Sequence, residues 1–267
     1  MHAKKSLGQH FLMHARIAER IALTAGLAPD TVVLEIGPGT GILTRELLST
    51  VGGSASGGKH GKVIAVEADR ELFEKLHIDF ANEIADGRLE LIHGDIRTYP
   101  HFGPTGLKLG YSVVANIPYY LTGDIFRMFL ETKNQPSSLT LLVQKEVAER
   151  IARSKKESIL SLSVKAYGTP KYEFTVKRGA FVPAPNVDSA VLTVRDISRG
   201  NFTSRAQEEK FFALIHAGFA HKRKYVRRNL VNVGFPAGNI PEKARAEDLS
   251  LSDWLILSST GPAAGLP

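Results

Sequence analysis

The stretch Val32-Val-Leu-Glu-Ile-Gly-Pro-Gly-Thr-Gly41 joins a short apolar run to three glycines at alternate positions. The run Val32–Ile36 is nearly all apolar, which is typical of a strand that is covered on both faces. Glycines in the loop let the backbone pass close to a ligand and turn sharply into a following helix. Because glycines also serve tight packing between a strand and a helix, this loop alone is weak evidence for a ligand. It predicts an α/β protein whose first strand ends in a glycine-rich loop.

Apolar runs and helical patterns alternate along the chain to about residue 195, which is the signature of an α/β sheet. Five runs suit buried parallel strands, and two later runs alternate like antiparallel strands at the far edge of the sheet. The expected strands are, in this order, residues 32–36, 62–66, 89–93, 112–115 and 139–143, then 172–177 and 190–195. The expected helices are residues 44–51, 70–85, 124–132, 145–153 and 159–166. The fold class is therefore α/β, with a mostly parallel, Rossmann-like sheet of seven strands.

A change of composition at residues 197–204 marks a linker to a second, smaller domain. The chain beyond it follows a helical pattern over residues 206–231 and again around residues 249–257. We therefore expect a Rossmann-like domain at residues 1–199 and a small helical domain at residues 200–267.

The composition limits the compartment and the chemistry of the protein. Cysteine is absent, which excludes disulfides, thiolate metal ligands and cysteine nucleophiles. The sequence contains no run of about 18 apolar residues, so we expect no membrane span. The start, Met1-His-Ala-Lys-Lys5, leads into mixed residues rather than into the apolar core of a signal peptide. We therefore expect a cytoplasmic protein without a metal site.

The net charge of +7 is unevenly distributed. Residues 1–139 hold 14 lysines and arginines against 15 acidic residues, whereas residues 140–267 hold 20 against 12. This asymmetry favours a first half that carries out chemistry and a second half that binds a polyanion.

Polar residues follow the next three predicted strands and are expected at the same edge of the sheet as the glycine loop. Glu67 ends the second strand, where a carboxylate can accept hydrogen bonds from both hydroxyls of a ribose. Asp95 follows the third strand and can accept a hydrogen bond from an adenine amino group. The fourth strand ends in Asn116-Ile-Pro-Tyr119, whose amide, carbonyl and aromatic groups can grip a flat ring with an amino group, although Asn-x-Pro is also ordinary turn chemistry. The four loops in this order favour an S-adenosylmethionine methyltransferase over a dehydrogenase, since the Gly-x-Gly-x-x-Gly spacing is missing.

Motifs along nearly the whole chain resemble the ribosomal RNA adenine dimethylase family, in particular the type that modifies small-subunit rRNA. Together these motifs are highly specific, whereas the glycine loop alone is not. They are Ser6-Leu-Gly-Gln-His-Phe-Leu12, Leu34-Glu-Ile-Gly-Pro-Gly-Thr-Gly41, Glu67, Gly94-Asp-Ile96, Asn116-Ile-Pro-Tyr119, Gln144-Lys-Glu-Val-Ala-Glu-Arg-Ile151, Phe181-Val-Pro-Ala-Pro-Asn-Val-Asp-Ser-Ala-Val191 and Phe211–Leu230.

The resemblance implies an enzyme that uses S-adenosyl-L-methionine to dimethylate N6 of two adjacent adenosines near the 3′ end of small-subunit rRNA, during ribosome biogenesis. The cofactor contacts that it implies are His10, Leu12, Gly37, Gly39, Glu67, Asp95 and Asn116. His10 departs from the family, which usually has asparagine there, and a structural role for this histidine is equally compatible with the sequence.

The resemblance also implies which residues hold the target adenine. The Asn116 side chain and the Pro118 carbonyl would accept hydrogen bonds from its amino group, and Tyr119 would stack on its ring. Phe181 is the family's candidate for the opposite face of the ring, with a core aromatic beside a proline turn as the alternative.

The run His221–Arg228 is the strongest candidate for RNA binding. Phe212, Ile215 and Phe219, just upstream, lie at helical spacing and are expected in the core of the small domain. The basic run would then lie on the polar face of the same helix, where it either contacts phosphates or is simply solvated. Its five basic residues are Lys222, Arg223, Lys224, Arg227 and Arg228.

Three functions remain open at this point. The favoured one is the small-subunit rRNA dimethylase, acting as a monomer on a pre-30S particle. The alternatives are a large-subunit rRNA dimethylase of the macrolide-resistance type, and a non-catalytic assembly or transcription factor with the same fold.

Overall fold

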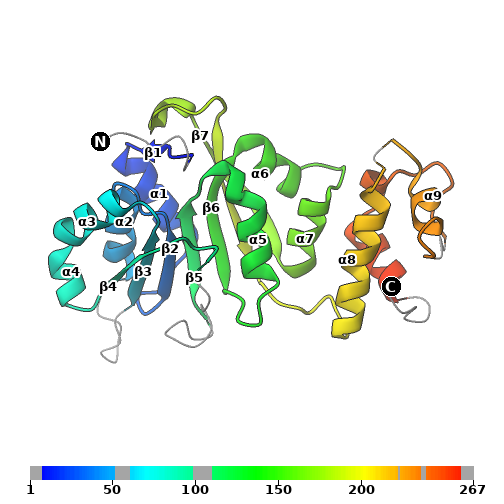
Figure 1. Ribbon diagram of the computed structural model, residues 1–267, viewed down its shortest axis with the longest axis horizontal. Coiled ribbons are helices and arrows are strands. Elements are labelled where there is room, and N and C mark those ends of the chain that lie inside the picture. The colour runs from blue at the N-terminus through cyan, green and yellow to red at the C-terminus, as the bar shows by residue number, and fades with distance from the viewer. Residues whose placement is uncertain (1–7, 52–60, 99–109, 222, 236–238, 260–267) are drawn as a thin grey trace. The chain divides into compact units, whose positions relative to one another are not determined.

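The computed structural model describes residues 8–51, 61–98, 110–221, 223–235 and 239–259 (Figure 1). Within this part of the chain, two compact units are present. The first comprises the described residues up to Ala148 together with Lys171–Ile197, and the second comprises Glu149–Pro170 and the described residues from Ser198 onward. The domain boundary after residue 199 stays a prediction. In the structure, Glu149–Pro170 belongs to the same compact unit as the C-terminal helices.

A seven-stranded sheet organises the first unit, which confirms the predicted mostly parallel α/β fold. Strands β2 to β6 run parallel, and β9 runs antiparallel to β6. The order across the sheet is β4 (Leu89–His93), β3 (Lys62–Glu67), β2 (Val32–Ile36), β5 (Ser112–Asn116), β6 (Ser138–Gln144), β9 (Ser189–Arg195) and β7 (Thr169–Val176). The chain moves outward from β2 to β4 and then returns to the other side of β2 with β5. This reversal leaves a crevice at the carboxyl ends of β2 and β5, where open α/β sheets bind ligands.

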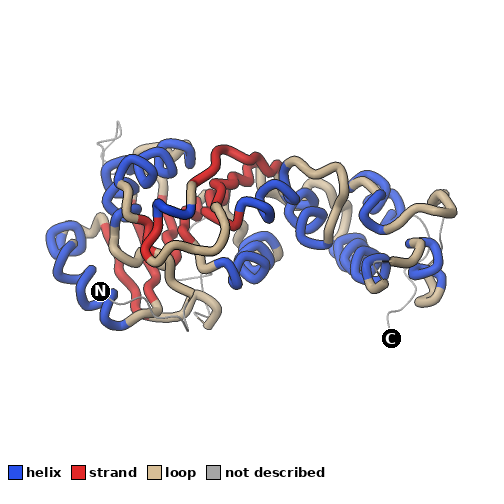
Figure 2. The backbone as a smooth tube through the Cα atoms, turned by 90° about the horizontal axis from the view of Figure 1, so that it is seen from above, coloured by secondary structure: helices blue, strands red, loops and turns tan. Residues whose placement is uncertain are grey.

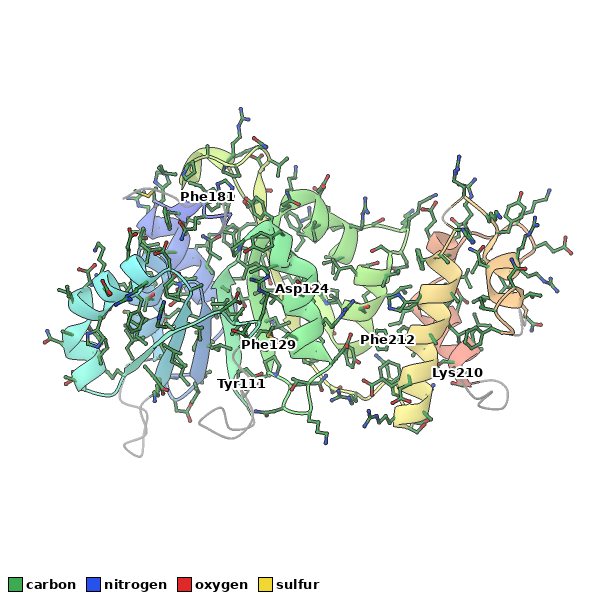
Figure 3. The ribbon with its side chains drawn as sticks, viewed as in Figure 1. Tyr111, Asp124, Phe129, Phe181, Lys210 and Phe212 are labelled. Atoms are coloured by element: carbon green, nitrogen blue, oxygen red, sulfur yellow. The ribbon has the colours of Figure 1, made fainter. Side chains whose placement is uncertain are left out.

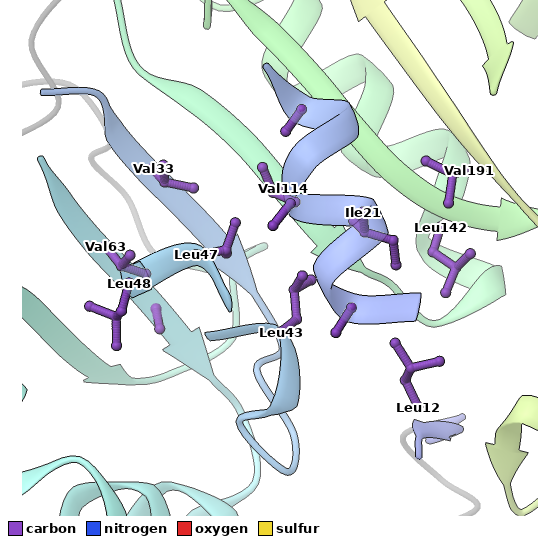
Figure 4. Close-up of a cluster of buried hydrophobic side chains, with 14 of the residues drawn as sticks. Leu12, Ile21, Val33, Leu43, Leu47, Leu48, Val63, Val114, Leu142 and Val191 are labelled. Atoms are coloured by element: carbon purple, nitrogen blue, oxygen red, sulfur yellow. The ribbon is translucent and has the colours of Figure 1, made fainter. Parts of the chain in front are cut away.

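Helices lie on both sides of the strands, as Figure 2 shows, and account for the apolar character of the strands. The helices of this unit are α1 (Ala15–Ala25), α2 (Ile42–Val51), α3 (Arg70–Asp79), α4 (Ala81–Ala85) and α5 (Thr122–Leu130), and α6 (Lys145–Ala152) follows β6 across the boundary between the units. Figure 4 shows side chains of α1 and α2 in one buried cluster with Val33, Val114 and Leu142 of the strands.

Helix α1 was not predicted from the sequence, although its signals are present. Ala18, Ile21, Ala22 and Ala25 recur at helical spacing and are all buried. The helix ends at Gly26, which adopts the left-handed conformation (φ 64°) that helix ends favour in glycine.

A second, two-stranded sheet was also missed. In it, β1 (Phe11–Leu12) pairs antiparallel with β8 (Phe181–Val182), so that Leu12 lies opposite Phe181. Strands of two residues are too short to show any periodicity, so only the fold brings them together. The pairing fixes the segment before α1 over the sheet's ligand-binding edge.

The second unit has its own apolar core, built from α7 (Ile159–Tyr167), α8 (Arg205–Phe219), α9 (Val226–Val231) and α10 (Leu251–Ser259). Of the residues expected there, Ile215 is fully buried, and the partly buried Phe212 and Phe219 pack against the core. Figure 3 labels Phe212 and Lys210 on α8.

The predicted continuous helix over residues 206–231 was wrong, because the chain leaves the helix between α8 and α9. The buried Asn229 explains this break. Its side-chain nitrogen donates to the carbonyl oxygens of Gly218 (2.7 Å), in the last turn of α8, and of His221 (3.3 Å), just beyond that helix. Gly218 itself has no room for a side chain, since a Cβ would lie 2.3 Å from Trp254. As a result the basic run begins in a turn, and its last two arginines lie in the first turn of α9.

Candidate active site

One cavity lies at the carboxyl edge of the sheet, at the crevice between β2 and β5, and spans about 1030 Å³ including space open to solvent. It brings together residues from the ends of β2, β3 and β5, the loop after β4 and the segment before α1. The sequence-predicted residues that line it are His10, Leu12, Gly37, Gly39, Glu67, Asp95, Asn116, Pro118 and Tyr119.

The glycine loop is held in a conformation that other residues rarely adopt. Gly37 and Gly39 have φ angles of 65° and 59°, in the left-handed region. A Cβ on Gly37 would meet no atom within 4 Å, so it would project into open cavity space. A Cβ on Gly39 would lie 3.2 Å from the Phe11 ring, which packs over the loop. The loop therefore offers bare backbone to any ligand in the cavity.

Glu67 stabilises this loop from the neighbouring strand. It is 5% exposed, and its two carboxylate oxygens accept hydrogen bonds from the backbone N–H groups of Gly39 (3.0 Å) and Asp69 (2.9 Å). Burial raises the pKa of Glu67, while these N–H donors oppose the shift. Each oxygen has a further lone pair, so Glu67 can hold the loop and still accept a hydrogen bond from a ligand.

Asp95 is paired with Arg97 at the cavity wall. The arginine Nη2 lies 2.6 Å from Oδ2, and its Nε lies 3.1 Å from both carboxylate oxygens. Hydrogen bonds from Arg97 hold the pKa of Asp95 below its ordinary value. Asp95 is therefore an ionised acceptor whose orientation is fixed by the guanidinium group.

The orientation of the Asn116 amide is also fixed. Its Nδ2 donates to the main-chain carbonyl of His10 at 3.1 Å. Because a carbonyl cannot donate, this contact assigns the nitrogen and leaves the side-chain oxygen of Asn116 as an acceptor. Two residues later, the Pro118 carbonyl accepts from the Leu121 N–H (3.0 Å) and retains a second lone pair.

Tyr119 is held at both ends. Its hydroxyl lies 2.7 Å from the Ser189 hydroxyl, and burial raises the pKa of the Tyr119 hydroxyl. Its ring stacks with the His10 imidazole at a centroid distance of 5.7 Å and an interplanar angle of 25°. The His10 Nδ1 lies in turn 2.8 Å from the carbonyl oxygen of Pro183.

Phe181 lies in the buried core, which is the alternative that the sequence left open for it. It is 2% exposed, belongs to the buried core cluster and does not line the cavity. The pairing of β8 with β1 sets Phe181 opposite the buried Leu12. Side chains alternate along a strand, so the next residue, Val182, is the exposed one, at 57%. In this conformation Phe181 offers no ring face to the cavity.

Several cavity residues were not predicted. Arg97 and Gln9, which donates to Asp69 (3.1 Å), both line it, and so does Tyr120 with 54% exposure. Glu35 is the most unusual of them, since it is 1% exposed and its Oε2 has no hydrogen-bond partner among the described residues. Burial raises the pKa of Glu35 to about 8. A lone acid in an otherwise apolar strand was the available signal for it.

The predicted RNA-binding residues lie in the second unit. Lys222 is outside the described residues. The other four are exposed, and within the described part of the chain none of them forms an ion pair: Arg223, Lys224, Arg227 and Arg228. The adjacent Tyr225 is 48% exposed. The surface thus carries uncompensated positive charge beside an accessible aromatic ring.

The remaining expectations concern metals and membranes. Among the described residues, no group of three or more histidines and acidic residues is arranged to hold a metal ion. No helix in the described ranges is both long and apolar enough to cross a lipid bilayer.

Comparison with known proteins gives consistent matches. A family model described as ribosomal RNA adenine dimethylase matches residues 1–258. The ribosomal RNA small subunit methyltransferase A of Dehalococcoides mccartyi strain BAV1 is 37% identical over 263 residues, covering 94% of this chain and 86% of the relative. Its counterpart from Fusobacterium nucleatum is 34% identical, and the match covers 95% of this chain and 96% of the relative.

Two solved structures share the fold. The 23S rRNA methyltransferase ErmE superposes with a TM-score of 0.72 at 24% identity, covering 93% of this chain and 98% of that one. A dimethyladenosine transferase from Plasmodium falciparum superposes with a TM-score of 0.72 at 23% identity, covering 93% of this chain and 96% of that one. The fold, together with the family model and the named relatives, therefore defines a Rossmann-like methyltransferase. Within that class, the chain belongs to the ribosomal RNA adenine dimethylase family, which confirms the resemblance seen in its sequence.

Proposed function

We propose that this enzyme transfers methyl groups from S-adenosyl-L-methionine to N6 of two adjacent adenosines near the 3′ end of small-subunit rRNA. The observation that carries the chemistry is the amide of Asn116, fixed by the His10 carbonyl so that its oxygen is an acceptor at the cavity. The choice of small-subunit rRNA is supported by the relatives at 34–37% identity that bear this name.

The cavity residues fit the proposed cofactor. A Cβ on Gly37 would enter the cavity, so the backbone there is open to close approach by a ligand. Glu67 has acceptor capacity for ribose hydroxyls, and the ionised Asp95 can accept from an adenine amino group. When bound, S-adenosyl-L-methionine supplies an electrophilic methyl group.

The corner at the end of β5 suits an amino group attached to an aromatic ring. The lone pair of adenine N6 is delocalised into the ring, so N6 is a poor nucleophile. Acceptance of its two protons by the Asn116 oxygen and the Pro118 carbonyl favours the pyramidal geometry that attack requires. Tyr119 stacks on the adenine, which is unpaired or flipped out of its helix. No strong base is needed, because the N6 proton becomes acidic once the methyl group has been transferred.

The second unit is proposed to bind the RNA. Arg223, Lys224, Arg227 and Arg228 can neutralise phosphates, and Tyr225 offers a ring for an unpaired base. We place this function in the small helical domain expected at residues 200–267. We further propose that the enzyme acts as a monomer on pre-30S particles in the cytoplasm.

Methyl transfer to isolated ribosomal particles tests this function. The protein is incubated with radiolabelled S-adenosyl-L-methionine and unmethylated 30S or 50S particles, and the modified adenosines are mapped. We expect label in 30S particles at two adjacent adenosines near the 3′ end of the rRNA. Label in 50S particles alone would instead indicate a large-subunit enzyme, and no label in either would indicate a non-catalytic factor.

A further inference from the structure

Tyr120 is the exposed aromatic residue of the cavity wall. Among the described residues that line the cavity, His10, Phe11 and Tyr119 are partly buried, whereas Tyr120 is 54% exposed. The Tyr119 hydroxyl is bonded to Ser189, but the Tyr120 hydroxyl has no hydrogen-bond partner within the described ranges. We propose that Tyr120 contacts the RNA directly, as the surface on which the base next to the target adenosine stacks. This inference rests on the proposed function and adds a contact to a second nucleotide.

The position of the Tyr120 ring is fixed by its surroundings. Tyr120 lies in a short 3-10 helix, η2 (Tyr119–Leu121), and the Thr122 hydroxyl donates to the carbonyl oxygen of Tyr119 at 2.9 Å. The ring packs against Gly8, where a Cβ would lie 3.1 Å from one ring carbon and 3.2 Å from another. The ring is therefore supported by the protein while much of the residue stays open to solvent, as a surface for stacking an unpaired base requires.

The place of Tyr120 in the chain selects the neighbouring nucleotide as its partner. Tyr119 is proposed to stack on the target adenine, and the Cα atoms of consecutive residues are only about 3.8 Å apart. An enzyme that methylates two adjacent adenosines must shift by one nucleotide between targets, so the base beside the target changes. Stacking on an aromatic ring tolerates any base, because every base has a π face. Tyr120 can thus hold the neighbouring base in both reactions.

Three substitutions separate stacking from simple packing. Tyr120→Phe keeps the ring, Tyr120→Leu keeps apolar bulk beside Gly8 without a ring, and Tyr120→Ala removes both. Leu23→Ala is the control, since Leu23 on α1 is 69% exposed and does not line the cavity. Each variant is compared with the wild type by kcat/KM for 30S particles, by calorimetric binding of S-adenosylhomocysteine and by thermal unfolding.

We expect Tyr120→Ala and Tyr120→Leu to lower kcat/KM for 30S particles about tenfold, which is within the range for one base stacked on an aromatic ring. Tyr120→Phe and Leu23→Ala should remain within about threefold of the wild type, and every variant should bind S-adenosylhomocysteine within about threefold of the wild-type affinity. If the alanine variant does not fold, the comparison between leucine and phenylalanine decides.

Crosslinking identifies the nucleotide that Tyr120 contacts. Tyr120 is replaced by the photoreactive p-azidophenylalanine, and the protein is bound to unmethylated 30S particles with S-adenosylhomocysteine, so that no transfer occurs. After irradiation, the crosslinked nucleotide is mapped by reverse transcription. We expect the crosslink at one of the two adjacent adenosines or at a nucleotide that directly flanks them.

Equal activity of Tyr120→Leu and Tyr120→Phe would overturn the inference, because the ring would then only fill space. The absence of a crosslink at or beside the methylated adenosines would also overturn it. A loss of S-adenosylhomocysteine affinity with unchanged kcat at saturating cofactor would assign Tyr120 to the cofactor instead. An inactive wild type on both 30S and 50S particles would reject the proposed function itself.

Discussion

The side-chain nitrogen of Asn116 lies 3.1 Å from the main-chain carbonyl oxygen of His10, which is 106 residues earlier in the chain. This bond joins the strand end proposed to hold the target to the segment that crosses the cavity before α1. The positions of these two segments, which are remote in sequence, are therefore linked, and a displacement of one should shift the other.

Asn116→Ala should reduce methyl transfer by about 100-fold or more while RNA affinity stays nearly unchanged, because it removes one acceptor for N6. Single-turnover transfer and filter binding of RNA measure the two effects. Asn201→Ala is the matched control, since the side chain of Asn201 also donates to a main-chain carbonyl, that of Ala166, but in the second unit. Equal losses in both variants, or a loss of RNA binding in Asn116→Ala, would contradict the assigned role.

Glu67→Gln should weaken binding of S-adenosylhomocysteine at least about tenfold. The substitution replaces one carboxylate oxygen with an NH2 group that faces a backbone N–H, so both the loop and the ribose lose an acceptor. Isothermal calorimetry measures the effect. Glu90→Gln, on β4 and paired with Lys62 away from the cavity, should bind like the wild type.

Gly37→Ala should impair cofactor binding by filling the cavity as well as by straining the backbone. Placing a residue that has a Cβ at positive φ lowers the free energy of unfolding by about 1–2 kcal/mol. Gly87 provides the control, since its φ of 72° and the open space around its Cβ position match those of Gly37, but it does not line the cavity. We expect similar losses of thermal stability in both alanine variants and weaker S-adenosylhomocysteine binding in Gly37→Ala alone. Normal binding by Gly37→Ala would place the cofactor elsewhere.

Arg227→Ala and Arg228→Ala should weaken RNA binding and reduce its salt dependence. Each phosphate contact that is lost should lower the slope of log K against log salt by about 0.7 for single-stranded RNA. Fluorescence anisotropy at several salt concentrations measures the slope. Arg205→Ala serves as the control, because Arg205 is paired with Glu209 on the same unit. A slope unchanged by all three substitutions would mean that the basic run is only a solvated surface.

Glu35→Gln should stabilise the protein more at high pH than at low pH. The folded-state pKa of Glu35 is about 8, above its ordinary value of 4.5, so the folded protein retains a proton that the unfolded chain has released. The contribution of Glu35 to stability is therefore present below pH 4.5 and is lost as the pH rises to 8. Glutamine has no such dependence, and the difference between variant and wild type should grow by up to about 1.4 kcal/mol per pH unit.

Urea unfolding at pH 5, 6, 7 and 8 measures this difference, with the exposed Glu74→Gln as the control. A stability difference that is constant across this range would show that Glu35 is ionised in the folded protein.

Strands were predictable because a buried parallel strand is a short, nearly unbroken apolar run, as Val32–Ile36 and Ser112–Asn116 are. The residues at their carboxyl ends could then be placed at one edge by topology alone. Local pattern failed where distant contacts decide the conformation. The amide of Asn229 bonds to a last-turn carbonyl of α8 from outside that helix, and β1 exists only because β8 lies beside it.

The same limit applies within the site. Sequence placed Glu67, Asp95 and Asn116 at the cavity, but the Arg97 partner of Asp95 was not foreseen. The stacking of His10 on Tyr119 joins residues from two remote loops, so no local spacing could reveal it. For Phe181, the choice between core and cavity depends on which face of a two-residue strand points inward, and no local pattern reveals that.

The strands that carry the glycine loop and the Asn116 corner are direct neighbours in the sheet, with Ile36 beside Ala115. Their separation is the spacing of two hydrogen-bonded strands, about 4.8 Å, which surface loops cannot change. The proposed alignment of methyl donor and acceptor would thus be set by the backbone of the sheet. Under the proposed function, the RNA-contacting residues of the second unit can therefore change while this spacing stays constant.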